Sequence, residues 1–399
     1  MTRTLLRGGS LFDGSAFADA DLVVQDGRIV AVGRDLDGDD EVDCTGRTLL
    51  PGLIDCHVHV MITGVDLLKE LQAPFSYPFY EAIGNLSATL DVGITTVRDA
   101  GGADLGLKRA VANGLVRGPR MQISVSILSQ TGGHGDGWMP CGSVVPLLQP
   151  HPGMPSGVVD GVDPMRHKAR EVLRAGADVL KVCTTGGVLS AADDPRHSQF
   201  SPAELAVLVE EAAAQHKPVM AHAQGTEGIK NAVRAGVRSV EHGIYLDDEA
   251  LDLMLERGTW LVPTLVAPRS VIAAADAGAA IPAVMVDKAR ATAAIHTRSI
   301  TRAVEAGVAI AMGTDSGVGP HGTNLDELPL MVGCGMSPES ALAAATSGAA
   351  RLLGLHDEVG RLEPGLRADL VLVDGDAHDL DGLAGRVRGV WQDGVRVVG

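Results

Sequence analysis

Two histidines, His57 and His59, end an apolar run and are separated by one residue. Side chains alternate along a β-strand, so residues two apart point to the same face. Both imidazoles could therefore bind one metal ion. A His-x-His pair is weak evidence alone, because chance and core packing also produce it. Its position directly after Pro51-Gly52-Leu53-Ile54-Asp55 strengthens the prediction of a metal site.

A lysine, Lys181, lies inside a second apolar run, Val179–Thr184. Burying an ammonium group is costly unless it is paired or has a function, although a long side chain can also reach the surface. A lysine with a lowered pKa could react with CO2 to form a carbamate, whose two oxygens would bridge two cations about 3.5–4 Å apart. We interpret Lys181 as such a bridging ligand.

Three more candidate ligands end apolar runs: His222, His242 and Asp315. Each histidine could be an ordinary core or surface residue, and Asp315 could simply cap a helix. The histidines, however, end successive runs at a spacing that suits one strand-helix-strand unit, and both are followed by glycine. We expect them to bind a second ion, while Asp315 binds the first and accepts a proton from a bridging water.

The elements that must position these residues form a repeating pattern. Helical segments separate the apolar, β-branched runs, most clearly Pro202–Gln215, Glu227–Gly236 and Asp287–Gly307. Eight strand-helix repeats predict an α/β fold, a (β/α)8 TIM barrel, in which catalytic groups lie at the carboxyl ends of the strands. The runs are Leu49–Val60, Gly93–Ala100, Arg120–Leu128, Val179–Thr184, Pro218–His222, Ser239–His242, Thr259–Val266 and Ala309–Thr314.

Both ends of the chain differ from the middle. They contain short alternating stretches separated by Asp-Gly turns, which are typical of β-hairpins. Neither end has enough strands for a good sheet alone, so we expect one small antiparallel β-sandwich built from both termini. The predicted domains are residues 1–53 with 356–399 for the sandwich and 54–355 for the barrel.

Two connections in the predicted barrel are long. Ser129–Pro164 is rich in Gly and Pro, and long loops in compact domains usually have a function. The segment that follows the seventh strand has helical patterns, and we expect it to be scaffold.

The composition is that of an ordinary globular protein, with 399 residues, 45% hydrophobic, 21% charged and 3% aromatic. The net charge of −17 argues against nucleic-acid or anionic-membrane binding, which needs clustered Lys and Arg. The first residues lack an apolar signal segment, and no run is long enough to span a membrane. The five scattered cysteines predict small buried thiols in a reducing cytoplasm. The oligomeric state stays open, a homo-oligomer included.

Taken together, these motifs resemble the amidohydrolase superfamily over nearly the whole chain. They comprise Leu-Pro-Gly-Leu-Ile-Asp-Cys-His-Val-His, Gly-Ile-Thr-Thr-Val-Arg-Asp, the strand-end ligands and the tail Gly-Arg-Leu-Glu-Pro-Gly-Leu-Arg-Ala-Asp-Leu-Val-Leu-Val-Asp. The resemblance implies two divalent ions, with zinc first among the candidates, and carboxylated Lys181 between them. It assigns His57, His59 and Asp315 to the first ion, and His222 and His242 to the second.

Within the superfamily, the chain resembles the Xaa-Pro dipeptidase and imidazolonepropionase-like group. The stretch around His134 and the stretch Val240–Asp247 are similar to those of metallo-dipeptidases and carboxypeptidases. This likeness implies that Tyr245 polarises the carbonyl and that His134 binds a substrate carboxylate. An ordinary capping tyrosine and an ordinary loop histidine are the alternatives. Arg98 and Asp99 are expected to orient neighbouring groups.

The function that this resemblance implies is cleavage of an amide or peptide bond in a small molecule, as by a dipeptidase or carboxypeptidase acting on Xaa-Pro dipeptides or N-acyl amino acids. A metal-bridging hydroxide would attack the carbonyl, with Asp315 as general base and then acid.

Three alternatives remain. A mononuclear deaminase or an imidazolonepropionase-like cyclic amidohydrolase would generally lack Lys181, and deaminases tend to have a glutamate where Gly225 stands. A two-metal site could instead hydrolyse a lactone, a carbamate or phenylurea, or another amide, because fold analogy does not separate these substrates. A binding protein without activity would have lost ligands, yet all six are present.

Overall fold

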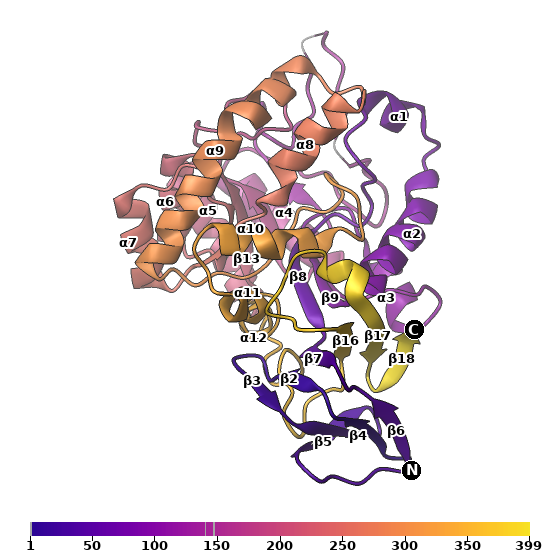
Figure 1. Ribbon diagram of the computed structural model, residues 1–399. Helices are drawn as coiled ribbons and strands as arrows, with labels where there is room; N and C mark the ends of the chain where they lie inside the picture. Colours follow the sequence, from indigo (N-terminus) through magenta and orange to yellow (C-terminus); the bar gives the residue numbers. More distant parts are fainter. Residues whose placement is uncertain (1, 140, 147) are drawn as a thin grey trace.

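The computed structural model describes residues 2–139, 141–146 and 148–399 of the chain. Figure 1 shows two regions: strands from both ends of the sequence gather near the N terminus, and strands alternating with helices form the larger remainder. The second region contains every predicted metal ligand.

The larger region is built on parallel strands, as the repeating pattern predicted. One sheet has the order β10-β9-β8 and the other β11-β12-β13-β14-β15. The single run predicted as a third strand is divided into β10, which pairs with β9, and β11, which pairs with β12. The strands are β8 (Leu53–Val58), β9 (Ile94–Asp99), β10 (Arg120–Ile123), β11 (Ile127–Leu128), β12 (Leu180–Cys183), β13 (Val219–Ala223), β14 (Ser239–His242) and β15 (Trp260–Val262).

The last predicted strand, Ala309–Thr314, is not a continuous strand; Ile310 makes an isolated parallel bridge to Leu261. The segment still bonds both neighbours: Ala311 N donates to Leu261 O at 3.0 Å, and Cys56 N donates to Met312 O at 2.9 Å. A Cβ atom on Gly313 would lie 2.4 Å from a Val262 methyl and 2.9 Å from His57 Cβ. Glycine at this position therefore lets the segment fit between β15 and β8.

Helices follow the strands, and their ends carry the expected signals. In α5, Ser201 and Glu204 form a reciprocal capping box, and α6 ends at Gly236 with φ 96°. The helices are α1 (Leu67–Gln72), α2 (Tyr77–Asp91), α3 (Leu105–Ala112), α4 (Val162–Arg174), α5 (Pro202–Ala213), α6 (Thr226–Ala235), α7 (Asp248–Arg257), α8 (Val266–Asp276), α9 (Ala283–Ala306), η1 (Asn324–Asp326), α10 (Glu327–Gly333), α11 (Pro338–Ala344), α12 (Ser347–Leu353) and η2 (Leu383–Arg386).

The two ends of the chain share one sheet, with the order β18-β17-β16-β7-β2-β3, and a second sheet has the order β5-β4-β1-β6. Leu22 and Trp391, one from each sheet, belong to a common hydrophobic core. The strands are β1 (Thr4–Arg7), β2 (Ser10–Phe12), β3 (Phe17–Asp19), β4 (Asp21–Gln25), β5 (Arg28–Gly33), β6 (Asp40–Asp43), β7 (Arg47–Pro51), β16 (Leu370–Asp374), β17 (Val387–Gln392) and β18 (Val395–Val398).

Two details of the sequence prediction were wrong here. The sheets are mixed rather than purely antiparallel, because β1 pairs with β6 and β2 with β7 in parallel. The predicted run Leu49–Val60 is also divided between two sheets. Its first residues, in β7, pair with β16, whereas β8 pairs with β9. The hydrophobic pattern of a run does not show whether its residues pair within one sheet or within two sheets.

All five cysteines are free thiols, and four of them are buried, as expected. The fifth, Cys141, is exposed, so the prediction of buried thiols was wrong for this residue. Among the described residues, no helix is long and apolar enough to cross a membrane.

Candidate metal centre

The six predicted metal ligands line one cavity, which we call the inner cavity. It encloses about 830 Å³, part of it open to solvent, at the carboxyl ends of the parallel strands. The ligands come from β8, β12, β13, β14 and the segment after Ala309: they are His57, His59, Lys181, His222, His242 and Asp315. The structure therefore brings together residues as far apart in sequence as His57 and Asp315.

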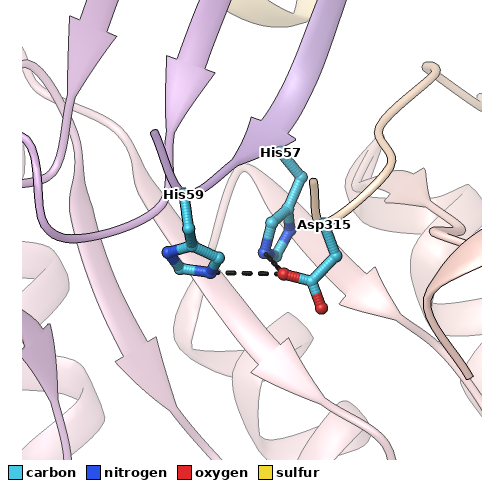
Figure 2. Close-up of side chains that lie close together, drawn as sticks. All are labelled: His57, His59 and Asp315. Carbon is cyan, nitrogen blue, oxygen red and sulfur yellow. Dashed lines mark ion pairs between the residues drawn. The ribbon is translucent and has the colours of Figure 1, made fainter. Parts of the chain in front are cut away.

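Three of these side chains form a compact cluster in which all the candidate ligand atoms lie within 4.8 Å of one another. Asp315 Oδ1 is 3.4 Å from His57 Nε2 and 3.2 Å from His59 Nε2. Figure 2 shows both imidazoles directed at this carboxylate oxygen, while the other oxygen points away from them. Two imidazole nitrogens and one carboxylate oxygen suit zinc and also manganese, cobalt or iron.

Each histidine of the cluster is oriented by a contact that its other ring nitrogen, Nδ1, makes. His57 Nδ1 lies 2.8 Å from the Glu241 carboxylate, and His59 Nδ1 lies 2.9 Å from the backbone oxygen of Gly101. When Nδ1 is the donor in a neutral ring, Nε2 carries no proton. In both rings the Nε2 lone pair is then available to a metal ion next to Asp315. Metal-binding histidines usually have such partners, which fix the tautomer.

Glu241 is a functional residue that the sequence analysis missed. It is fully buried, and its other oxygen accepts a hydrogen bond from Arg98 Nη2 at 3.0 Å. Burial opposes ionisation, but Arg98 and His57 lower the pKa of Glu241 to about 2. Arg98 was expected to orient neighbouring groups, and its contact with Glu241 links it to the candidate metal ligand His57.

His242 follows Glu241 directly, and strict alternation would place their side chains on opposite faces of β14. The backbone of His242 has φ 74°, a conformation that is rare for a non-glycine residue. This turn at the end of β14 allows both neighbours to face the interior. Asp315 has φ 59° as well. Strained backbone of this kind is often found at functional sites.

The two histidines predicted for the second ion lie close together, with ring centroids 4.7 Å apart. His242 Nδ1 lies 2.7 Å from Thr264 Oγ1. His222 differs from the others because its Nε2 lies 3.1 Å from Gly186 O, which leaves Nδ1 as its free nitrogen. Both rings line the same cavity as the cluster.

Lys181 is buried, and its Nζ lies 3.4 Å from His57 Nε2. Burial lowers the pKa of Lys181 below its ordinary value. The neutral amine, which is the form that reacts with CO2, is therefore more populated than in an exposed lysine. Lys181 lines the inner cavity together with His222 and His242.

The charges of most of the other ligands favour metal binding, and His59 is the exception. Burial would raise the pKa of Asp315, but His57 and His59 hold it well below its usual value. Burial and nearby positive groups lower the pKa values of His222 and His242. For His59, the effect of burial is outweighed by Asp315, so its pKa is raised. Neutral imidazoles and ionised carboxylates are the forms that bind metals.

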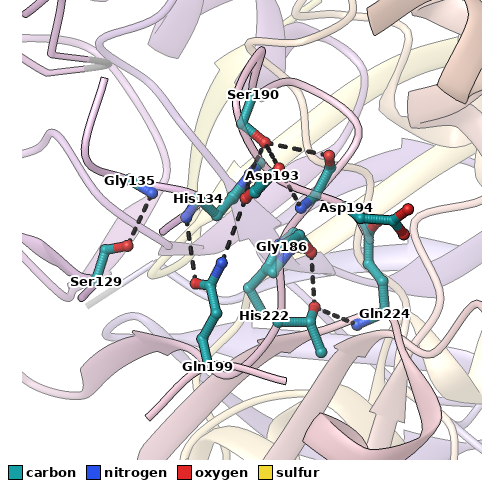
Figure 3. Close-up of polar contacts among 12 residues, drawn as sticks. Ser129, His134, Gly135, Gly186, Ser190, Asp193, Asp194, Gln199, His222 and Gln224 are labelled. Atoms are coloured by element: carbon teal, nitrogen blue, oxygen red, sulfur yellow. Dashed lines mark hydrogen bonds and ion pairs between the residues drawn. The ribbon is translucent and has the colours of Figure 1, made fainter. Parts of the chain in front are cut away.

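His134 lies against His222, and little of its side chain is open to solvent. Its ring stacks on His222 with centroids 4.2 Å apart, and its Nδ1 lies 3.0 Å from Ser190 Oγ. Figure 3 shows Gln199 accepting a hydrogen bond from the backbone nitrogen of His134. Burial lowers the pKa of His134, so a substrate carboxylate would meet a neutral imidazole.

Comparison with known proteins agrees with this site. The model of the Amidohydrolase family matches residues 48–398. The chain belongs to the amidohydrolase family. It is 36% identical to ochratoxinase of Aspergillus niger over 396 residues, covering 93% of this chain and 81% of that protein.

Solved structures resemble the whole chain. A prolidase in complex with N-methylphosphonate-L-proline is 36% identical with a TM-score of 0.92, and a Xaa-Pro dipeptidase with bound methionine is 34% identical with a TM-score of 0.91. Each match covers 100% of both chains. Like these relatives, the chain is a hydrolase that acts on amide or peptide bonds.

Tyr245 of this amidohydrolase lies on the loop after β14 and is half-buried. Among the described residues, the lining of the inner cavity includes its neighbour Ile244 but not Tyr245. Burial raises the pKa of its phenol, and the charged groups that also affect this pKa are Arg196, which lowers it, and Asp194, which raises it. To reach a substrate carbonyl, the side chain would have to turn from Arg196 toward the cavity.

The segment after β15 is part of the amidohydrolase site, which corrects the expectation that it is only scaffold. Ala267, Pro268 and Val271 of α8 and His296 of α9 line the inner cavity. Helical periodicity indicated the helices but not which side faces the substrate.

Gln224, two residues after His222, also lines the inner cavity. It is buried, and its Oε1 atom has no hydrogen-bond partner in the structure. A buried polar atom without a partner is costly, so Gln224 is well placed to accept a hydrogen bond from a bound substrate.

Proposed function

We propose that this chain is a two-metal dipeptidase or carboxypeptidase that cleaves Xaa-Pro dipeptides or N-acyl amino acids. The observation that carries the proposal is the meeting of six candidate ligands around one cavity, with His57, His59 and Asp315 in a compact cluster. The donor set fits divalent ions, since it combines imidazole nitrogens with a carboxylate and a neutral amine.

In this proposal, His57, His59 and Asp315 hold one ion, and His222 and His242 hold the other. Lys181, carboxylated at Nζ, holds both. Zinc is the metal that we test first. Divalent ions at such a site supply Lewis acidity and lower the pKa of a nearby water molecule towards ~7.

Asp315 moves the proton. Its low pKa keeps the carboxylate ionised at neutral pH, and the oxygen directed away from His57 and His59 is free to accept a proton (Figure 2). Asp315 takes a proton from the attacking water and delivers it to the nitrogen of the leaving group. The buried pair of Glu241 and Arg98 keeps His57 in position during this transfer.

Three residues are proposed to contact the substrate. His134 lies next to His222 and faces the cavity, where it binds the substrate carboxylate as a neutral donor. Gln224 Oε1 accepts a hydrogen bond from the substrate. Tyr245 polarises the carbonyl after its side chain turns away from Arg196.

The similar structures support the peptide substrate, because their names describe a prolidase and a Xaa-Pro dipeptidase at 34–36% identity. Hydrolysis of a non-peptide amide, carbamate, phenylurea or lactone is the alternative. An imidazolonepropionase-like reaction is less well supported, because Lys181 is buried at the site and Gly225 caps α6 where deaminases tend to have a glutamate.

The proposal includes the finer architecture. We infer that segment 309–316 closes the parallel strands into a (β/α)8 barrel, since it bonds both β15 and β8. Residues 1–53 and 356–399 would form the β-sandwich and residues 54–355 the barrel, in a cytoplasmic enzyme.

A substrate screen tests this function. Zinc-loaded protein is assayed against Xaa-Pro dipeptides, other dipeptides, N-acyl amino acids, lactones and carbamates. Turnover of dipeptides or N-acyl amino acids, lost in Asp315→Asn, supports the proposal. Turnover of lactones but not of amides would overturn it.

A further inference from the structure

A second cavity, which we call the outer lobe, adjoins the inner cavity. It encloses about 820 Å³, part of it open to solvent. Val65, His134 and Leu189 line both spaces, so the two spaces meet at these residues. A substrate cleaved at the metal centre could therefore extend past Leu189 into the outer lobe.

The lining of the outer lobe is mostly apolar. Trp138, Met139 and Met285 contribute large side chains, and Pro146 and Pro282 contribute rigid ones. Such surfaces bind aromatic and branched aliphatic groups, and methionine sulfur packs well against aromatic rings.

The charge of the outer lobe limits what can bind. Asp136 is the one lining residue, among those the structure describes, with a side chain that is charged at neutral pH. Its Oδ2 accepts a hydrogen bond from Gly132 N at 2.8 Å. With no cation in this lining, a carboxylate or phosphate entering the lobe would lose its hydration without gaining a partner.

The wall between the two cavities is held in place from α9. Lys288 Nζ donates to the backbone oxygens of Gly187 and Ser190 at 3.0 and 2.8 Å and lies 3.3 Å from Asp193 Oδ1. Ser190 in turn bonds Asp193 and His134 (Figure 3). The loop that carries Leu189 is therefore fixed on both sides of that residue, at Gly187 before it and at Ser190 and Asp193 after it.

Glycine is required where this loop passes His134. A Cβ atom on Gly187 would lie 2.2–2.8 Å from three atoms of the His134 ring. The loop can thus lie directly on the imidazole, and this close packing places Leu189 where the two cavities meet.

We propose that the outer lobe is a substrate subsite for a large, uncharged apolar group, aromatic or branched aliphatic, attached to the amide that the metal centre cleaves. This inference rests on the proposed function for the position of the cleaved bond. Three observations indicate this kind of group: the two cavities are continuous, the lining of the outer lobe is mostly apolar, and its described lining residues include no cation.

Binding can be tested without turnover, because the fluorescence of Trp138 should change when a ligand enters the outer lobe that it lines. The other two tryptophans, Trp260 and Trp391, are buried elsewhere. Tryptophan emission is titrated with 2-naphthamide and with 2-naphthoate. We expect a saturable change with the amide, at least tenfold weaker binding of the carboxylate, and loss of the signal in Trp138→Phe. No saturable change, or equal binding of the two probes, would overturn the inference.

A second experiment fills the outer lobe with a larger side chain and measures substrate preference. Ala191 lines it and is partly exposed, so Ala191→Phe should block a large group but not a small one. The substrates are two matched pairs: N-naphthoyl-leucine with N-acetyl-leucine, and N-acetyl-naphthylalanine with N-acetyl-alanine. In at least one pair we expect wild-type kcat/KM to favour the larger member tenfold or more, and the variant to lose that preference with the smaller member changed less than twofold.

Ala18→Phe, on an exposed strand of the terminal sheets, is the matched control and should keep the preference. Equal losses for both members of each pair in Ala191→Phe would contradict the subsite. If wild-type protein cleaves no member of either pair, the proposed function fails for these amides, and the fluorescence titration still decides whether the lobe binds apolar groups.

Discussion

The carboxylate of Glu241 lies 2.8 Å from His57 Nδ1, in a part of the interior where both side chains are almost completely buried. This contact fixes the ring of His57 so that Nε2 faces Asp315 and Lys181. Because Arg98 neutralises the other oxygen of Glu241, the buried charge does not stand alone. The candidate metal ligand His57 is thus held in position by Glu241 and Arg98, which are not among the six candidate ligands.

Replacement of Glu241 by glutamine should weaken metal binding by about 10–100-fold, the usual effect of losing a partner of a ligand histidine. The amide cannot accept from both Arg98 and His57 as the carboxylate does. Competition with a chelator measures the affinity. Glu249→Gln, which removes an exposed charge on α7, is the control. Equal affinity in both variants would show that Glu241 has no role at the site.

Asp315→Asn should retain part of the metal while kcat falls by about 10²–10⁴-fold, because the variant loses the group that moves the proton. Metal content per chain and steady-state kinetics are measured on the same preparation. A kcat within threefold of wild type would exclude Asp315 as the general base and acid.

For Tyr245→Phe, the expected result is a lower kcat with little change in KM, since a group that polarises the carbonyl acts mainly in the transition state. Rapid steady-state assays over a range of substrate concentrations separate the two constants. If only KM changes, or neither does, Tyr245 keeps the position beside Arg196 that the structure gives it and takes no part in catalysis.

Stability should depend on the ionisation of Glu327. Its carboxylate accepts hydrogen bonds from Leu265 N and Val266 N, but burial raises its pKa from 4.5 to about 8. The folded state then holds a proton that the unfolded state releases, so the free energy of unfolding falls as pH rises from about 4.5 to about 8.

In Glu327→Gln this dependence is absent. Relative to wild type, the variant should therefore gain roughly 1 kcal/mol or more between pH 5 and pH 8, measured by urea unfolding of metal-free protein. Glu305→Gln, an exposed change on α9, should leave the pH dependence as in wild type. Parallel curves for all three proteins would show that Glu327 ionises normally.

The sequence was sufficient to predict the α/β class and the six candidate ligands that line the inner cavity. The reason is physical: ligands at strand ends converge in any fold of parallel strands, so their position in each run carries the information. Glu241 could not be predicted in this way, because strand alternation places it opposite His242. Only the left-handed backbone of His242 allows both to face inward.

The contribution of α8 to the cavity was missed for a related reason. The pattern after the predicted strand Thr259–Val266 indicates helices, but the side that Pro268 and Val271 present is set by how α8 is anchored. Glu327 supplies that anchor from 61 residues away, and a contact at such a distance leaves no local signal. The outer lobe likewise depends on Lys288 reaching a loop nearly a hundred residues earlier in the chain.

Metal stoichiometry tests the central claim most directly. Wild-type protein and Lys181→Ala are produced in zinc-supplemented medium, and zinc per chain is measured together with amide turnover; Lys108→Ala, outside the site, is the control. The two-metal site with Lys181 as bridging ligand predicts two ions in wild type and in the control. In Lys181→Ala it predicts one or none, with turnover reduced at least 100-fold. Two ions and unchanged turnover in Lys181→Ala would contradict it.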